Sequence, residues 1–374
     1  MSVAAQKLPS YALCTPEEAE EYARDTKEGH WNLLPHETFW RERYIYLESK
    51  GYKLRPRFDP TWTPSWLGTN RDPDFCEDSV ISMKSGIIDA TRLSDGVRVM
   101  IKSVSRIKDE APIARFLTSG DLVQDPTNHC VPVFGVVDDP HDASKAMMVM
   151  QYLRPFDKPE FRTIGEVVDF VAQTLEGLCF IHSHLVAHRD CAAANIMMDA
   201  SHLFPKGHHP VRLEYTADAV FDAPHLTRSD HPVKYYFVDF GLSSRFKPDE
   251  SPLVVGTKGR DKEPPELSDR QPYNPFPLDI FILGNLYLKG FLEKYHGLDF
   301  LEPLVVSMVH RQPDQRPTAQ SAHQSLRELR TTLGETTLRW RLRSRQEGTS
   351  ERVVYDTIAV AREGLYQLKR MMMT

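Results

Sequence analysis

Two short polar motifs constrain this chain more than any other feature. The first is the run AHRDCAAAN at Ala187–Asn195, and the second is DFG at 239–241, which follows an apolar, strand-like run. Asn195 follows Asp190 by five positions, so a turn of the loop can bring both side chains to one small volume. Amide and carboxylate oxygens are ligands that hard cations such as Mg²⁺ prefer. Gly241 is expected to let the chain leave the Asp239 turn at a backbone angle closed to other residues.

Either tripeptide alone is a weak signal, because HRD and DFG also occur as ordinary loop and strand-to-turn sequences. The ordered pair is much stronger, and the apolar run at 177–186 is typical of a helix end that enters a loop. Other segments accompany the pair. They are VRVMIK at 97–102, EPPE at 263–266, DIFILG at 279–284 and DQRPT at 314–318.

Together these segments resemble the eukaryotic protein kinase family. GLCFIHSHLVAHRD resembles its helix-E and catalytic-loop segment, and VRVMIK resembles its lysine strand. EPPE resembles the APE motif, DIFILG the helix-F motif and DQRPT the late arginine motif. In that family the APE glutamate pairs with the late arginine, so the resemblance implies a pair between Glu266 and Arg316. A narrower resemblance, to expanded protein kinase-like families of mushroom-forming fungi, is carried by PVKYYFVDFGLS and by the N-terminal WRER segment.

The resemblance implies a bilobal α+β fold, with a small antiparallel β lobe that carries one helix and a larger, mainly helical lobe. It also implies ATP and Mg as cofactors. Asp190 would be the catalytic base, Asn195 and Asp239 the metal ligands, and Lys102 the contact to the nucleotide phosphates. The other nucleotide-binding candidates are Glu110 on helix C, Gly86, the gatekeeper Met150, the hinge residues Gln151, Tyr152 and Leu153, and Met197 beneath the adenine.

The pattern around Glu110 predicts one buried helical face, because Ile113 and Leu117 follow at helical intervals. Pro112 is compatible with that helix only if the helix begins close to Glu110, since proline is tolerated in the first turn but not in the interior. An exposed lysine on an ordinary strand remains the alternative for Lys102. A plain core methionine is the alternative for the methionine positions.

Three departures from the family pattern weaken the expectation of catalysis. Residues 79–92 stand in the place of the glycine-rich loop but contain only Gly86, which cannot reproduce a backbone cradle for phosphates. Met100 replaces a small residue of the lysine strand. The catalytic loop has Ala192 and Ala194 where kinases of the serine/threonine and tyrosine types carry a cation, and this loss is expected to slow phosphoryl transfer.

Three functions therefore compete. The first is an ATP- and Mg-dependent protein kinase acting on a protein hydroxyl, Ser/Thr being favoured over Tyr on base rate. The second is a pseudokinase that acts as a binding or scaffold module. The third, a small-molecule phosphotransferase, is disfavoured by the EPPE, helix-F and RPT-like segments, which build the peptide-docking side of protein kinases.

The segment 201–232 separates the two motifs by more chain than a kinase hairpin needs, so we interpret it as a surface insertion. Its histidines match no compact zinc site, and we interpret them as polar side chains that face solvent. They are His202, His208, His209, His225 and His231.

Composition agrees with a large folded enzyme or binding module. The chain has 374 residues, 41% of them hydrophobic, and a formal net charge of −6, which gives no basic field for nucleic acid. Its five cysteines are scattered and odd in number, which indicates a reducing compartment. With no apolar leader and no long apolar span, we expect an intracellular protein, in cytoplasm or nucleus, that acts on a protein substrate and binds no membrane.

The motifs predict four parts of the chain. Residues 1–75 form an N-terminal extension that packs on the kinase body, with a helix capped by Thr15 and a strap bearing Trp62 and Trp66. The small lobe spans 76–153 and the large lobe 154–333, including the insertion. Residues 334–374 form a basic, helical tail, whose apolar residues dock on a lobe or bind a partner helix, docking being favoured. The extension and the tail are the candidate partner-binding segments. The apolar residues of the tail are Val354, Ile358, Val360, Leu365 and Leu368.

Overall fold

A computed structural model describes residues 7–373, with side chains as far as residue 365 in the last helix. The described chain packs as two compact units, each assembled from separate stretches. The first unit comprises residues up to 107, 133–153 and 200–226, and the second comprises 108–132, 154–199 and the residues from 227 onward. These boundaries differ from the expected lobes at two places. The helix that begins at Glu110 packs with the second unit, and most of the insertion packs with the first.

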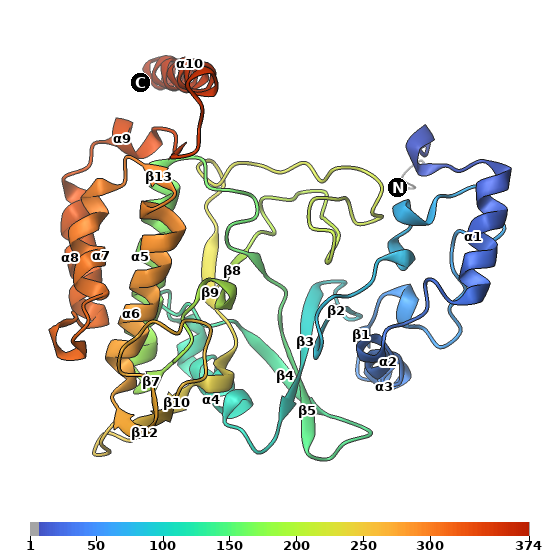
Figure 1. Ribbon diagram of the computed structural model, residues 1–374, viewed down its shortest axis with the longest axis horizontal. Coiled ribbons are helices and arrows are strands. Elements are labelled where there is room, and N and C mark those ends of the chain that lie inside the picture. The colour runs from blue at the N-terminus through green and yellow to red at the C-terminus, as the bar shows by residue number, and fades with distance from the viewer. Residues whose placement is uncertain (1–6, 374) are drawn as a thin grey trace. The chain divides into compact units, whose positions relative to one another are not determined.

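The first unit is built on one antiparallel sheet with the strand order β1-β2-β3-β5-β4 (Figure 1). Alternation in β3 turns Val99 and Ile101 into the core, which is the pattern expected of a strand with one buried face. The strands are β1 (Tyr52–Lys53), β2 (Ile87–Arg92), β3 (Arg98–Ser105), β4 (Val133–Asp138) and β5 (Lys145–Gln151).

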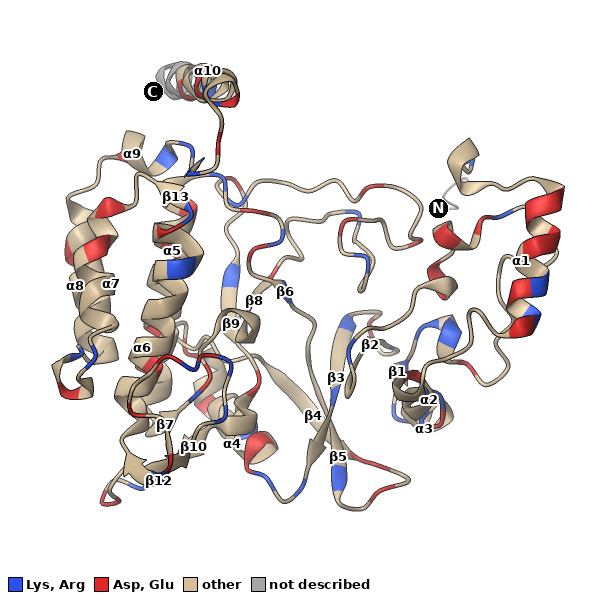
Figure 2. Cartoon of the chain, in the orientation of Figure 1, with Lys and Arg blue, Asp and Glu red and all other residues tan. Residues whose placement is uncertain are grey.

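The N-terminal extension supplies half of the core of this unit. Its helices are α1 (Pro16–Glu28), α2 (Pro35–Arg41) and α3 (Tyr44–Ser49). Trp40, Tyr44 and Phe58 are buried in one cluster with sheet residues such as Ile101 and Val149. The predicted cap of α1 is present, because Thr15 and Glu18 form a capping box. Figure 2 shows acidic residues gathered along α1.

The tryptophans of the strap pack against the extension itself. Trp66 is buried, its ring contacts Trp31 and Trp62, and its indole N–H donates to Thr26 of α1 at 2.9 Å. The indole N–H of Trp62 donates to Asp78 at 2.9 Å. The strap is therefore joined to α1 as one packed layer of the first unit.

A fully buried ion pair joins two parts of the extension. The Arg57 guanidinium donates to both carboxylate oxygens of Glu37, at 3.0 and 2.9 Å, and neither side chain is exposed. Burial acts to raise the pKa of Glu37, but the bonds from Arg57 and from the N–H groups of Ser82 and Leu34 outweigh it and lower that pKa. A bidentate, fully hydrogen-bonded pair of this kind is costly to break from one side.

We predict that Arg57→Ala lowers the free energy of unfolding by about 3 to 5 kcal/mol, because Glu37 is left buried without its partner. Because the folded pKa of Glu37 is lowered, its contribution is present above the ordinary glutamate pKa of about 4.3 and is lost as pH falls further. Urea unfolding from pH 7 to pH 3 measures both effects. The exposed Arg24→Ala is the control, and an equal loss in both variants would contradict the assignment.

The insertion is part of the core of the first unit rather than a surface loop. Leu203, Phe204, Ala219 and Val220 are buried. The interpretation of its histidines as polar side chains that face solvent is wrong for His208 and His209, which are 6% and 0% exposed. Local sequence does not distinguish a buried histidine from an exposed one, because the partners of both come from distant parts of the chain.

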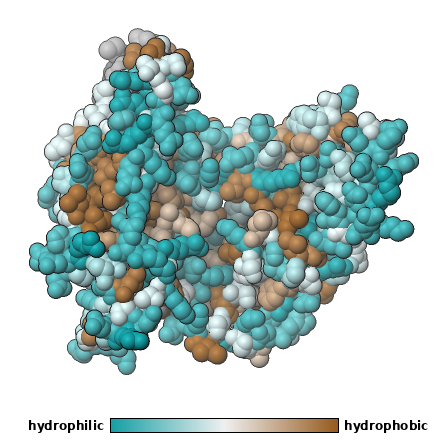
Figure 3. Space-filling view, viewed as in Figure 1, coloured by the Kyte–Doolittle hydropathy of each residue, from teal (hydrophilic) through white to brown (hydrophobic). Residues whose placement is uncertain are grey.

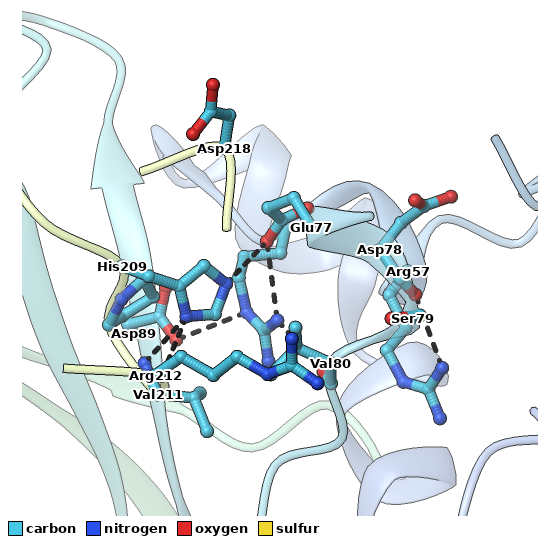
Figure 4. Close-up of polar contacts among 12 residues, drawn as sticks. Arg57, Glu77, Asp78, Ser79, Val80, Asp89, His209, Val211, Arg212 and Asp218 are labelled. Carbon is cyan, nitrogen blue, oxygen red and sulfur yellow. Dashed lines mark hydrogen bonds and ion pairs between the residues drawn. The ribbon is translucent and has the colours of Figure 1, made fainter. Parts of the chain in front are cut away.

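His209 lies in a polar cluster that fixes the insertion to the strap and the sheet (Figure 4). Its Nδ1 accepts from the N–H groups of Val211 and Arg212, at 3.1 and 2.9 Å, so the proton of the neutral ring is on Nε2. That Nε2 faces Glu77 Oε1 at 3.6 Å, and Glu77 also contacts Arg55. The insertion is therefore held by polar as well as apolar contacts.

We predict that Leu203→Ala destabilises the protein by about 2 to 5 kcal/mol, because it opens a cavity beneath the insertion. Leu226→Ala, at an exposed position of the same segment, is the matched control and should cost far less. Thermal unfolding followed by circular dichroism measures the difference. If both leucines prove equally dispensable, the insertion is a surface loop after all.

The second unit is mainly helical, with α5 at its centre packed against α8. The prediction for the segment after Glu110 is confirmed, since α4 begins at Glu110 and buries Ile113 and Leu117. The helices are α4 (Glu110–Leu117), α5 (Ile164–Ser183), α6 (Pro275–Tyr287), α7 (Glu302–Met308), α8 (Ala319–Thr331), α9 (Glu335–Arg339) and α10 (Thr349–Met373).

Short strand pairs complete the second unit. They are β6 (Arg154–Pro155) with β8 (Ile196–Asp199) and β9 (Lys234–Phe237), β7 (Val186–Ala187) with β10 (Ser244–Arg245), β11 (Val254–Gly256) with β12 (Ser268–Tyr273), and β13 (Tyr295–His296) with β14 (Arg343–Ser344).

The basic part of the C-terminal tail is attached to the second unit. Arg341 pairs with Glu347 and Asp356, and Arg339 pairs with Glu363, so the charged face of α10 is held by ion pairs. The predicted docking of the apolar residues is wrong over the described part of the helix. Val354, Ile358, Val360 and Leu365 are more than half exposed, and the side chain of Leu368 lies outside the described residues. Figure 3 shows hydrophobic side chains at the surface of α10.

Candidate active site

One hairpin of the second unit brings the two sequence motifs together. Strands β8 and β9 pair antiparallel, Asn195 directly precedes β8, and Asp239 follows β9 by two positions. The N–H of Val238 donates to the carbonyl of Asn195 at 2.9 Å, which closes this end of the hairpin. The proposed metal ligands therefore emerge from one end of a two-stranded ladder, although 43 positions separate them in the sequence.

Asp190 is held by neighbours on both carboxylate oxygens. The amide nitrogen of Asn195 donates to Asp190 Oδ2 at 2.7 Å and to the Asp190 carbonyl at 3.0 Å. The N–H of Arg260 donates to Asp190 Oδ1 at 2.8 Å. These contacts orient the carboxylate and place it beside the segment that follows the DFG turn.

The backbone of the catalytic loop is fixed by Asp279 of α6. This fully buried carboxylate accepts from the N–H of His188 at 2.7 Å and of Arg189 at 2.6 Å, and it also contacts His182 Nε2 at 3.0 Å. Arg189 has a φ of 66°, a backbone angle that is unfavourable for a residue with a side chain. The carboxylate compensates that strain, because it satisfies two consecutive N–H groups of the loop.

The DFG turn differs from its prediction in one respect. The left-handed backbone angle belongs to Asp239, with a φ of 64°, and not to Gly241. Gly241 instead leaves room for two carboxylates, because a Cβ there would be tight against them, at 3.0 Å from Asp239 Oδ1 and 3.2 Å from Glu110 Oε2. The glycine thus allows the α4 carboxylate to approach the DFG turn.

The side-chain oxygens of Asn195 and Asp239 fit a magnesium ion whose remaining ligands are water and phosphate oxygens. Asn195 is buried and directs its amide nitrogen toward Asp190, so the amide oxygen remains as the donor on the other side. Within residues 7–373 no group of three His, Cys, Asp or Glu could hold a metal. One amide oxygen and one carboxylate suit Mg²⁺, which usually takes few protein ligands alongside water and phosphate oxygens.

Burial shifts the pKa of two titratable neighbours of Asp190 in the direction that favours their uncharged forms. Burial lowers the pKa of His188, whose Nε2 contacts the carbonyl of Val238 at 3.1 Å. Burial, with the nearby Asp279 and Asp190 carboxylates, raises the pKa of the Cys191 thiol well above its usual range. A buried thiol of this kind is unreactive.

The first unit holds most of the remaining nucleotide-binding candidates. Lys102 lies on β3 opposite Met148 of β5, and Met150 is buried on β5 opposite Met100. Gln151 ends β5 and is followed by Tyr152 and the buried Leu153. Met197 is half-buried in β8 of the second unit. The sheet thus aligns Lys102 and the methionine positions on adjacent strands.

No glycine-rich hairpin precedes β3 in the described chain. The segment before β2 has no strand between Val80 and Gly86, and the neighbour of β2 on that side is the short β1. Gly86 adopts a φ of 73° and its carbonyl accepts from the N–H of Ser103 at 2.9 Å. Gly86 therefore forms a turn into β2 rather than a cradle.

The insertion contacts the predicted hinge, and no sequence pattern predicts this contact. The Tyr152 ring lies 5.8 Å from the His208 ring, and its hydroxyl donates to the carbonyl of Pro210 at 3.4 Å. Arg98 donates to the carbonyl of His208 at 2.8 Å and stacks over Tyr152. These contacts of the insertion join residues that are between 56 and 110 positions apart, so no local sequence pattern could have revealed them.

The pair implied between the EPPE segment and the late arginine is confirmed. Arg316 donates from Nη1 to Glu266 Oε1 at 2.5 Å and from Nη2 to Glu266 Oε2 at 2.9 Å. Arg316 is buried and also donates to the carbonyl of Pro277 in α6. This bidentate pair fixes the end of the segment that carries Arg260.

Comparison with known families agrees with these geometries. Residues 80–251 match the model of the family described as protein tyrosine and serine/threonine kinase, which is somewhat less than half of the chain. The matched segment contains Lys102, Glu110, Asp190, Asn195 and Asp239, and it belongs to the protein kinase-like family. The predicted fold class is confirmed as an α+β kinase-like fold. No helix within residues 7–373 is long and apolar enough to cross a membrane.

We predict that Asp279→Asn loosens the catalytic loop. The N–H groups of His188 and Arg189 bond to different oxygens of the Asp279 carboxylate, and the amide nitrogen that replaces one of these oxygens cannot accept a hydrogen bond. One buried N–H is then left without a partner, at a cost of about 1 to 3 kcal/mol. Hydrogen exchange should become faster at these two amides than in the wild type. The exposed Asp299→Asn is the control, and unchanged protection in Asp279→Asn would count against this role.

Proposed function

We propose that this protein is an ATP- and Mg-dependent protein kinase that phosphorylates a protein hydroxyl. The observation that carries the proposal is the joint placement of Asp190, Asn195 and Asp239 at one end of the β8–β9 hairpin, with the Asn195 amide turned so that its oxygen is the remaining donor. The kinase-family match over 80–251 supports the same reaction class.

Each residue has one task in this proposal. Asp190 orients the acceptor hydroxyl and receives its proton, and the contacts from Asn195 and Arg260 hold its carboxylate in position. Asn195 and Asp239 would hold Mg²⁺, which neutralises charge on the nucleotide phosphates when bound. Lys102 would contact the phosphates as a point charge from β3.

A protein substrate is favoured over a small molecule. The segment from Gly256 to Glu266 is ordered against α6 by the Glu266–Arg316 pair and by bonds from Asn285 to Asp261 and Glu263, at 2.8 and 3.1 Å. A fixed platform beside the catalytic loop suits an extended peptide. The five free cysteines favour a reducing compartment, so we infer a substrate inside the cell.

The second candidate is a pseudokinase that binds partners without catalysis. Two observations favour it: β2 is preceded by no glycine-rich hairpin, and the catalytic loop carries alanine at 192 and 194. The first feature affects binding of the nucleotide phosphates, and the second affects stabilisation of the transferring phosphoryl group. The two candidates therefore differ first at nucleotide binding and then at transfer.

We predict that Mg-ATP raises the melting temperature and that ATP with a chelator raises it less, because Asn195 and Asp239 act through the metal. Asp239→Asn should remove the metal-dependent part. Purified protein with labelled ATP should phosphorylate itself or a generic acceptor, and Asp190→Asn should lose most of this activity. Differential scanning fluorimetry and phosphate incorporation measure the two steps.

The exposed Asp314→Asn is the control for both assays, since it makes the same substitution outside the two motifs. Labelling that is equal in wild type and Asp190→Asn would show a contaminating kinase and contradict the proposal. No thermal shift at millimolar nucleotide would favour the scaffold function instead.

A further inference from the structure

The catalytic loop of this chain carries no cation at the two positions after Asp190 where the resemblance to protein kinases implies one. Ala192 and Ala194 stand two and four positions after the base. Charge that develops on a transferring phosphoryl group needs an oriented positive partner in a site that excludes water. If the proposed reaction occurs, another part of the chain has to bring this charge to the loop.

Arg260 is brought directly against the base by its backbone. Its N–H donates to Asp190 Oδ1 at 2.8 Å. The preceding Gly259 has a φ of 131°, and a Cβ there would lie 3.5 Å from both the Arg189 carbonyl and Asp190 Oδ1. A glycine at this turn lets the chain approach the catalytic loop closely enough for that bond.

Arg260 also lines a cavity that reaches the catalytic loop. Together with Ala192 and Ala193 it lines this cavity of about 710 Å³ within the second unit. Arg260 is exposed, and within residues 7–373 its guanidinium makes no hydrogen bond or ion pair. The guanidinium is therefore available for a ligand in this cavity.

Two nearby cations on the same wall are already engaged. The Lys262 ammonium donates to the carbonyl of Thr257 at 2.7 Å. The Lys289 ammonium forms an ion pair with Glu263, which raises the pKa of Lys289 and lowers that of Glu263. Arg260 alone combines a direct bond to Asp190 with an uncommitted cationic group on this cavity wall, within the described residues.

We propose that Arg260 supplies the transition-state cation that the catalytic loop lacks, so that it is a catalytic residue of the proposed kinase reaction. In this step the acceptor hydroxyl oxygen forms a bond to the γ-phosphorus of ATP, and its proton passes to Asp190. The bond from that phosphorus to the bridging oxygen breaks, and ADP leaves with the electron pair. Arg260 stays protonated and donates to oxygens of the transferring group.

The inference rests on the proposed function, and Arg260→Gln tests it because this variant keeps the N–H that bonds to Asp190. The turnover number should fall about 10²- to 10³-fold, as expected when one oriented donor is lost. The KM for ATP should change little. Placing a cation on the loop itself, in Ala192→Lys/Arg260→Gln, should restore at least a tenfold part of that loss. Arg270→Gln, at an exposed position of β12, is the matched control.

A binding measurement separates this role from a structural one. Aluminium fluoride with Mg-ADP mimics the transferring phosphoryl group, and it should raise the melting temperature of the wild type beyond Mg-ADP alone. Arg260→Gln should lose this additional shift and keep the shift from Mg-ADP. Full turnover in Arg260→Gln, or an undiminished fluoride-dependent shift, would overturn the inference while leaving the kinase proposal intact. A wild type without transfer would instead reject the proposed function.

Discussion

The geometry of the catalytic loop depends on one buried carboxylate, that of Asp279. The loop must pass through a left-handed angle at Arg189, which costs on the order of 1 to 3 kcal/mol. Two N–H groups that bond to a charged oxygen contribute roughly 1.5 to 3 kcal/mol each, so the carboxylate more than offsets the strain. The residues from Asp190 to Asn195, at the end of the hairpin, directly follow these two anchored peptide groups, so their position depends on this anchor.

The first unit has no glycine-rich hairpin before β2, and the N-terminal extension and the insertion complete its core instead. Where a glycine-rich hairpin is expected, β2 is flanked by the two-residue β1, and the core beneath is completed by Trp40, Tyr44 and Phe58 of the extension. The insertion adds Leu203 and His209 and reaches the hinge residue Tyr152. The extension and the insertion are thus structural parts of this unit. A sheet with so short an edge strand needs such cover to bury its apolar face.

The sequence predicted the features whose signals are local or whose residues resemble a family motif. The start of α4 at Glu110 followed from Pro112 and helical spacing, the Thr15 cap from a short motif, and the Glu266–Arg316 pair from the resemblance. The wrong predictions concern burial that distant chain decides. His209 has the composition of a surface loop around it, yet Glu77 and the sheet enclose it. The expected left-handed angle of Gly241 is also wrong, and the glycine instead leaves room for the carboxylates of Glu110 and Asp239.

The position of Arg260 has a consequence for control of the proposed reaction. A cation on the catalytic loop would be in place whenever the loop is folded, but Arg260 is in place only when the segment after the DFG turn lies against the loop. That segment is held by Arg189, which donates to Ser244 Oγ at 3.2 Å and to the Val255 carbonyl at 3.0 Å. The same residue whose N–H is fixed by Asp279 therefore also fixes the segment that carries Arg260. Arg189 therefore links Asp190, the proposed base, to Arg260, the proposed cation. Any change that displaces the segment carrying Arg260 removes both the bond from its N–H to Asp190 and the positive charge of its side chain.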